Sequence, residues 1–134
     1  MYSDKNRVKS LLSSAIKEME LLIAMSTPIK SANDFGVNLN GMTIFRACGM
    51  SLQFVTESFI KIRNLTGMKL FSNYSNIPWQ DVFGMRNFLS HQYVEVDAEG
   101  IYSTIKKDIP ELLTTSRQLL SDMDSGKYDT LFIL

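Results

Sequence analysis

The chain is organised around residues 77–97, which read IPWQDVFGMRNFLSHQYVEVD. This stretch contains the only histidine and the only tryptophan of the protein. Pro78 suits a first helical turn, where its missing N–H would have no partner in any case. We therefore predict a helix over residues 78–90. One side of this helix is apolar and should face the core, and it is made of Val82, Met85, Phe88 and Leu89.

The opposite side of the predicted helix is polar. Four side chains span about 140° around it, in the angular order Arg86, Ser90, Asn87 and His91. Asn87 and His91 are four positions apart, so their side chains can touch. Arg86 and His91 are five apart and cannot meet directly on a straight helix. Either they grip one ligand from two sides or a second chain completes the group, and Gly84 on the same side leaves room for either.

These residue types suit phosphodiester chemistry without a metal. His91 can transfer a proton near neutral pH, and the dipole at a helix C-terminus favours its charged form. Arg86 can bind phosphate oxygens in a bidentate fork and stabilise charge. Asn87 can fix the imidazole tautomer or hold a reacting group. Spacing alone, however, favours a plain helix end with a solvated polar face and a capping histidine.

Composition narrows the class of protein. A chain of 134 residues is long enough for one domain, residues 1–134, with a single core. Fourteen basic and fourteen acidic residues give no net charge, so any RNA contact must come from local patches. The single cysteine, Cys48, has apolar neighbours and is interpreted as a core residue. We expect no metal site, no cofactor, no membrane span and a cytoplasmic location.

Hydrophobic periodicity predicts the remaining helices. Two long helices are expected over residues 3–26 and 39–63, joined by an irregular connector. A second irregular stretch over residues 64–76 precedes the organising helix, and a short extended link over residues 92–96 follows it. Asp97 should then cap the last long helix. The prediction is an all-α antiparallel bundle of four to five helices.

Two features of the last helix complicate this pattern. Pro110 lies inside it and should kink or split the helix, with Asp108 able to cap the second part. The chain closes with the apolar residues 131–134, which we expect to pack on the bundle or on a second copy. In the second helix, Glu57 can approach the polar face of residues 78–90, but a surface carboxylate is the preferred interpretation.

Five short runs occur in a fixed order: Ile77-Pro78-Trp79, Gly84-Met85-Arg86-Asn87, His91-Gln92-Tyr93, Val96-Asp97 and Lys107-Asp108-Ile109-Pro110. Together they resemble the HepT-like family of HEPN ribonuclease toxins. The hallmark of that family is an arginine, a polar residue, a histidine after four intervening positions from the arginine, and a tyrosine two further on. The resemblance is strong over residues 77–113. It is fainter upstream, where FVTES at residues 54–58 looks like a degenerate form of the family's Ile-Gly-Glu-Ala segment.

The resemblance implies a HEPN-like bundle that forms a symmetric homodimer, with the motif faces of two subunits meeting across a shared cleft. It implies a toxin of a type VII-like toxin–antitoxin system that cleaves RNA, with Arg86, Asn87 and His91 as catalytic residues. It also implies that a partner nucleotidyltransferase antitoxin adds AMP to Tyr93 and so silences the toxin.

Two other functions remain open from the sequence. Some HEPN-type bundles are non-catalytic partners of nucleotidyltransferases and bind nucleotide or substrate. A dimeric interaction module without chemistry is the third possibility. The intact pair of Arg86 and His91 argues against a lost active site, so the resemblance favours the ribonuclease over the plain helix end.

Overall fold

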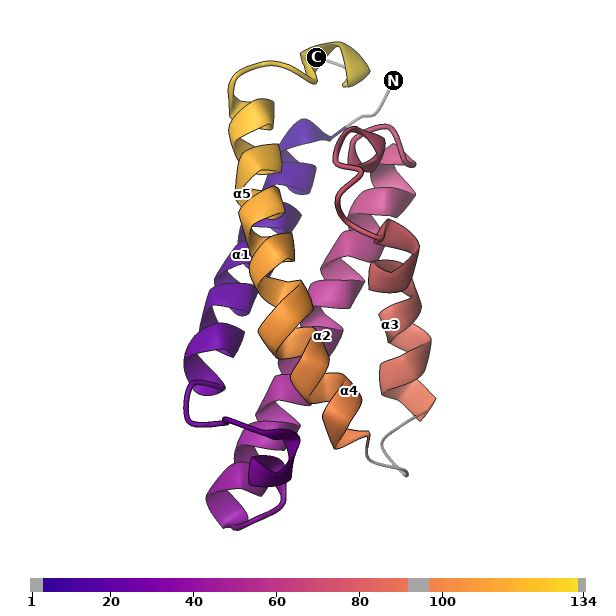
Figure 1. Ribbon diagram of the computed structural model, residues 1–134. Helices are drawn as coiled ribbons and strands as arrows, with labels where there is room; N and C mark the ends of the chain where they lie inside the picture. Colours follow the sequence, from indigo (N-terminus) through magenta and orange to yellow (C-terminus); the bar gives the residue numbers. More distant parts are fainter. Residues whose placement is uncertain (1–3, 92–96, 133–134) are drawn as a thin grey trace.

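The computed structural model describes residues 4–91 and 97–132, and these residues form a bundle of helices. The longest helices are α1 (Lys5–Met25), α2 (Leu39–Thr66) and α5 (Ile109–Asp124), and α1 packs against both of the others. The chain runs down α1, up α2, down α3 (Trp79–His91) and up through α4 (Ala98–Ser103) into α5 (Figure 1). The predicted all-α class is confirmed.

Side-chain caps begin three of these helices. Asp4 accepts a hydrogen bond from the Arg7 N–H at 2.9 Å, and Asn38 accepts one from Gly41 at 2.8 Å. Asp97 accepts one from the N–H of Gly100 at 2.9 Å, which confirms its predicted role. Each bond satisfies a first-turn N–H that has no partner within the helix.

Helix α2 ends three residues later than the sequence pattern predicts. It continues to Thr66 and stops at Gly67, whose φ of 63° lies in the left-handed region that favours glycine. The N–H of Gly67 donates to the carbonyl of Arg63 at 2.7 Å. A glycine in this position is a common helix stop, so the glycine sets the boundary rather than the change in composition at residue 64.

The break expected near Pro110 is present, but its form differs from the prediction. A wide π-helical turn, η3 (Thr104–Asp108), links α4 to α5, and the N–H of Ile109 bonds to the carbonyl of Thr104. Pro110 stands in the first turn of α5, where it needs no N–H partner. The expected cap by Asp108 is wrong, since its side chain makes no capping bond. The helical turns continue through η3 into α5, so no free helix N-terminus is left for Asp108 to cap.

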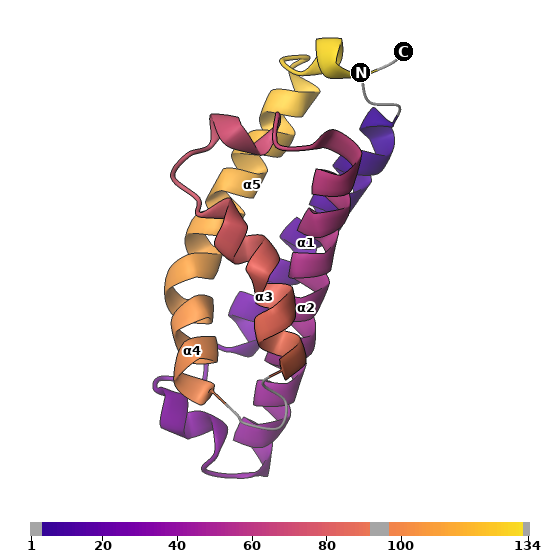
Figure 2. The ribbon, with the colours of Figure 1, turned by 90° about the vertical axis from the view of Figure 1, so that its right-hand side faces the viewer.

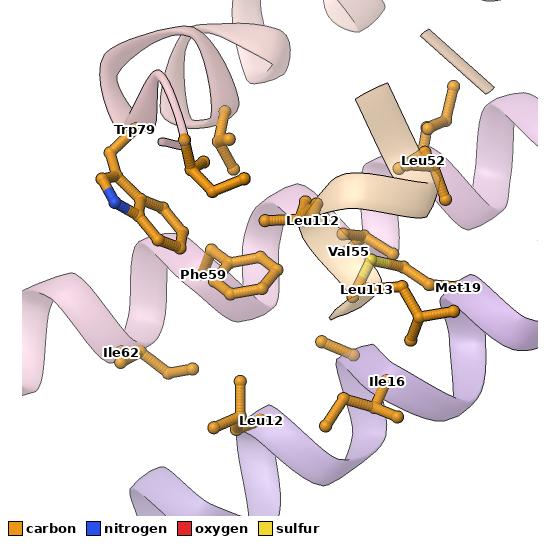
Figure 3. Close-up of a cluster of buried hydrophobic side chains, with 14 of the residues drawn as sticks. Leu12, Ile16, Met19, Leu52, Val55, Phe59, Ile62, Trp79, Leu112 and Leu113 are labelled. Atoms are coloured by element: carbon orange, nitrogen blue, oxygen red, sulfur yellow. The ribbon is translucent and has the colours of Figure 1, made fainter. Parts of the chain in front are cut away.

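The core is apolar and draws on every long helix. Figure 3 shows Leu12, Ile16 and Met19 of α1 directed toward Leu52, Val55 and Phe59 of α2, with Leu112 and Leu113 of α5 beside them. Cys48 is fully buried, as predicted. Phe132 is also buried, so this part of the apolar C-terminal run packs on the bundle; residues 133–134 and the predicted link over 92–96 lie outside the described residues.

Candidate functional site

Helix α3 carries most of the predicted site and is fastened to α2. The Nε1–H of Trp79 donates to the carbonyl of Tyr74 at 3.0 Å, and its ring packs against Phe59 and Phe71. Further along, the hydroxyl of Thr56 on α2 donates to the carbonyl of Val82 at 3.1 Å in a buried position. The two helices lie side by side and run in opposite directions (Figure 2).

The two-faced character predicted for α3 is confirmed where side chains are described. Val82 and Leu89 are buried, whereas Gly84, Arg86 and Asn87 are exposed. His91 is the last residue of α3. The side chains of Ser90 and His91, and the whole of Tyr93, lie outside the described residues.

Arg86 forms a bidentate ion pair with Glu57 of α2. Its Nε donates to Glu57 Oε1 at 2.7 Å, and its Nη2 donates to Oε2 at 2.6 Å. About half of the Arg86 side chain and a third of the Glu57 side chain remain exposed. Two parallel charge-assisted bonds fix both the position and the plane of the guanidinium. Arg86 is therefore held in one orientation at the surface between α2 and α3.

The ion pair shifts the pKa of both partners. The hydrogen bonds from Arg86 lower the pKa of the Glu57 carboxyl, and the positive charges of Arg86 and Lys61 act in the same direction against a smaller opposing effect of burial. The same bonds raise the pKa of Arg86. Glu57 is thus a carboxylate and Arg86 a guanidinium cation throughout the neutral range.

The exposed face of α3 is uncrowded at Gly84. A Cβ placed on Gly84 would meet no atom within 4 Å. Asn87 is exposed, and within the described part of the chain its amide has no hydrogen-bond partner. A cation held in place therefore stands next to an amide able to bind a further group, on a helix face open to a ligand or a second protein.

Comparison with known proteins assigns this arrangement to a family. The family model described as Ribonuclease HepT-like matches residues 11–119, most of the chain. The chain belongs to the Ribonuclease HepT-like family. The family predicted from the ordered runs over residues 77–113 is confirmed.

Several relatives of this HepT-like chain carry ribonuclease names. A putative RNase of Caldanaerobacter subterraneus subsp. tengcongensis is 32% identical over 105 residues, covering 78% of this chain and 87% of the relative. A probable ribonuclease HepT of Thermococcus cleftensis is 41% identical over a shorter segment of 39 residues, covering 29% of this chain and 36% of the relative. No solved structure matches the chain.

Glu57 is the residue whose contact with α3 the sequence left open. It is a surface carboxylate, as the preferred interpretation has it, with about a third of its side chain exposed, and both of its oxygens are also bonded to Arg86. Helical periodicity places Glu57 on the surface but does not show which neighbouring helix it faces. The available signal was the faint family likeness of residues 54–58, which include this acid.

Two further observations concern ligands and membranes. Across residues 4–91 and 97–132, no group of three or more histidine, cysteine, aspartate or glutamate side chains is placed to hold a metal ion. Among the helices that the structure describes, none combines the length and the apolar character that crossing a membrane requires.

Proposed function

We propose that this HepT-like protein is a metal-independent endoribonuclease and the toxin of a type VII-like toxin–antitoxin system, acting in the cytoplasm. Family membership and the ribonuclease names of the relatives support RNA as the substrate. The observation that carries the proposal is the half-exposed guanidinium of Arg86, held in a fixed plane beside Asn87 and five positions before His91. Phosphodiester cleavage without a metal can use a positioned cation and a proton-transfer group that act on the same phosphate.

The proposed reaction uses the 2′-hydroxyl of RNA as nucleophile. The 2′-hydroxyl gives up its proton as its oxygen attacks the adjacent phosphorus. The bond from that phosphorus to the 5′-oxygen of the next nucleotide breaks, and a proton passes to that leaving oxygen. The products are a 2′,3′-cyclic phosphate and a free 5′-hydroxyl. His91 moves the proton, a role that typically contributes about 10²–10⁴ in rate. Arg86 binds the phosphate and offsets the charge of the transition state, and Asn87 orients His91 or the ribose.

The proposal also includes a homodimer in which the α3 faces of two subunits meet around Gly84 and Asn87. Both residues are exposed, and Gly84 leaves space for another backbone. A symmetric contact supplies the neighbours that Arg86 and His91 cannot provide to each other along one helix. The cleft between the two subunits would then bind the RNA strand.

The test of catalysis uses Arg86→Ala and His91→Ala in purified protein. Each variant should keep its helical circular dichroism and its oligomeric state while losing cleavage by at least about a hundredfold. Arg117→Ala, an exposed arginine of α5 paired with Glu20, is the matched control and should cleave normally. Cleavage by wild type should persist in a chelator and leave cyclic phosphate ends. Undiminished cleavage by His91→Ala would refute the scheme.

Tyr93 is proposed as the site of regulation. Its phenolic oxygen would attack the α-phosphorus of ATP on the partner nucleotidyltransferase, releasing pyrophosphate and leaving AMP on the tyrosine. The added phosphate would crowd the cleft and compete for Arg86. Co-expression with the antitoxin should therefore add one or more AMP units, about 329 Da each, to the peptide that contains Tyr93. The modified protein should no longer cleave RNA. Full inhibition with an unmodified Tyr93, read by mass spectrometry, would contradict this role.

A further inference from the structure

The exposed face of α2 carries large apolar side chains that the proposed chemistry does not use. Leu39 is 76% exposed, Met50 70%, and both Met42 and Phe54 are 46% exposed. At 3.6 residues per turn these positions follow one another along the outer side of the helix. A line of methionine, leucine and phenylalanine side chains on a surface is typical of a contact between proteins.

Two opposite charges lie on the same face of α2. Arg46 and Glu57 are eleven positions apart, close to three helical turns, so they project in nearly the same direction about 16 Å apart along the axis. Arg46 is exposed and makes no ion pair with any residue that the structure describes. Met50 and Phe54 lie between the two charges. Along α2 the face therefore carries a cation, an apolar centre and an anion, with the exposed Lys61 one turn beyond the anion.

Two copies of this face of α2 have complementary charges when the helices run in opposite directions. If two copies of α2 lie antiparallel, Arg46 of each faces Glu57 of the partner subunit, and the apolar centres meet. A parallel pair would instead place Arg46 against its own copy and Glu57 against its own copy, and like charges in contact are destabilising. The charges therefore favour one direction and one register of two α2 helices.

The proposed contact between the α3 faces lies at the same height along the bundle. The midpoint between Arg46 and Glu57 falls near residue 51 of α2. Helix α3 runs the other way, and Val82 is level with Thr56 through their hydrogen bond. Advancing about five residues along α3 from Val82 reaches Asn87, which is thus level with that midpoint at about 1.5 Å of rise per residue. One two-fold axis can therefore serve both helices.

We propose that two copies of this chain associate through antiparallel α2 helices, and that Arg46 of each subunit pairs with Glu57 of the partner subunit and so becomes part of the partner's site. This proposal rests on the proposed function, because it concerns the partner of the same Arg86. In the monomer both Glu57 oxygens bond to Arg86. In the dimer the partner's Arg46 binds the same carboxylate, so Glu57 holds one guanidinium from each subunit beside the shared site.

Charge reversal tests the pairing. Arg46→Glu and Glu57→Arg should each raise the dimer dissociation constant at least about tenfold, because each creates two like-charge contacts per dimer. The double variant Arg46→Glu with Glu57→Arg should restore dimerisation. Arg7→Glu, an exposed arginine of α1, is the matched control and should leave the dimer unchanged. Sedimentation velocity across a concentration series measures all four, and circular dichroism checks that each is folded.

Three results would overturn the proposal. The first is a wild-type protein that stays monomeric. The second is a double variant no better at dimerising than its parents, since the two residues would then not face each other. The third is an Arg46→Glu protein that dimerises normally but binds RNA more weakly, because Arg46 would then bind RNA and not the partner subunit. None of these three results depends on RNA cleavage. Failure of the proposed α2 pairing can therefore be distinguished from failure of the proposed ribonuclease activity.

Disulfide trapping gives a second measurement that does not rely on charge. In the proposed register Met50 faces Gln53 of the partner subunit, so the Met50→Cys with Gln53→Cys variant should cross-link into a covalent dimer on mild oxidation. Leu39→Cys on the same face should not cross-link, because its two copies would lie about 37 Å apart. A parallel pair would cross-link both variants, so a covalent dimer of Leu39→Cys would contradict the antiparallel arrangement. Native Cys48 should not interfere, since burial raises its pKa to about 11.

Discussion

Arg86 depends on Glu57 for its orientation, and that dependence is sensitive to pH. A guanidinium stays charged at every accessible pH, so acid acts on the pair through the carboxylate. The pKa of Glu57 is lowered by its bonds to Arg86, so the folded protein holds this proton less tightly than the unfolded chain does. The contribution of the pair to stability is therefore complete above the ordinary carboxyl range and is lost as the pH falls through the lowered pKa.

Glu57→Gln should make this effect visible. The variant should be less stable than wild type at pH 7, and the difference should shrink as the pH falls through the lowered pKa of Glu57, where the wild-type carboxyl takes up its proton. Urea unfolding at a series of pH values measures the difference directly. A gap between the two proteins that stays constant throughout the acid range in which the wild type remains folded would show that the ion pair does not stabilise the fold.

How far the sequence predicts the site differs from residue to residue. The exposure of Arg86 and Asn87 follows from helical geometry alone, because one helix fixes which residues share a face. The contact between Arg86 and Glu57 joins residues 29 positions apart on two helices. No local pattern sets that distance, because it depends on how α3 packs against α2 through Thr56 and Trp79. The parts that the sequence predicts are those decided within one element.

At the scale of the helices, the prediction succeeds where a local stop signal is present. Asp97 begins α4 as expected from its position, and Gly67 ends α2. The form of the break at Pro110 was not predicted, because a proline shows only that the regular hydrogen bond is missing. Whether a helix stops, kinks or widens into a π turn depends on how the segments on each side pack against the core.

Gly41 provides a test at this scale. A Cβ at this position would lie 2.1 Å from the carbonyl oxygen of Asp34, part of the backbone of η1 (Ala32–Phe35), which cannot give way as a side chain would. We expect Gly41→Ala to lower the free energy of unfolding by about 1–3 kcal/mol even though alanine favours helices.

Gly36 is the control for this substitution. It lies five residues earlier, with φ of −111°, and an added Cβ would make only an ordinary contact at 3.9 Å. Gly36→Ala should leave the free energy of unfolding within about 0.5 kcal/mol of wild type. If chemical denaturation shows equal effects for the two variants, the close approach of η1 to α2 does not control stability.

For the whole molecule, the end of the chain is part of the bundle. The hydroxyl of Tyr128 donates to the hydroxyl of Tyr74 at 2.8 Å, which in turn donates to Asp122 of α5 at 2.5 Å. Phe132 is 1% exposed just beyond this network. The connector before α3, the end of α5 and the last described residues are therefore joined in one packed group.

Phe132→Ala should show what this packing contributes. Removing a buried phenylalanine ring typically costs about 3–5 kcal/mol, and we expect a loss near the lower figure because a chain end can relax around the space. Leu131→Ala, at a partly buried neighbour, should cost less. Denaturant unfolding gives both values. A Phe132→Ala protein as stable as wild type would mean that the C-terminal residues are not part of the cooperative unit.

The placement of Trp79 gives the protein a built-in optical reporter. This indole is the sole tryptophan, it is buried between Phe59 and Phe71, and it stands at the first residue of the helix that bears Arg86. Its fluorescence emission therefore reports how α3 packs against its neighbours and not the state of the whole bundle. Lifting of α3 from its neighbours would shift the fluorescence to longer wavelengths before the far-ultraviolet signal falls, so movement of α3 can be followed in the unlabelled protein.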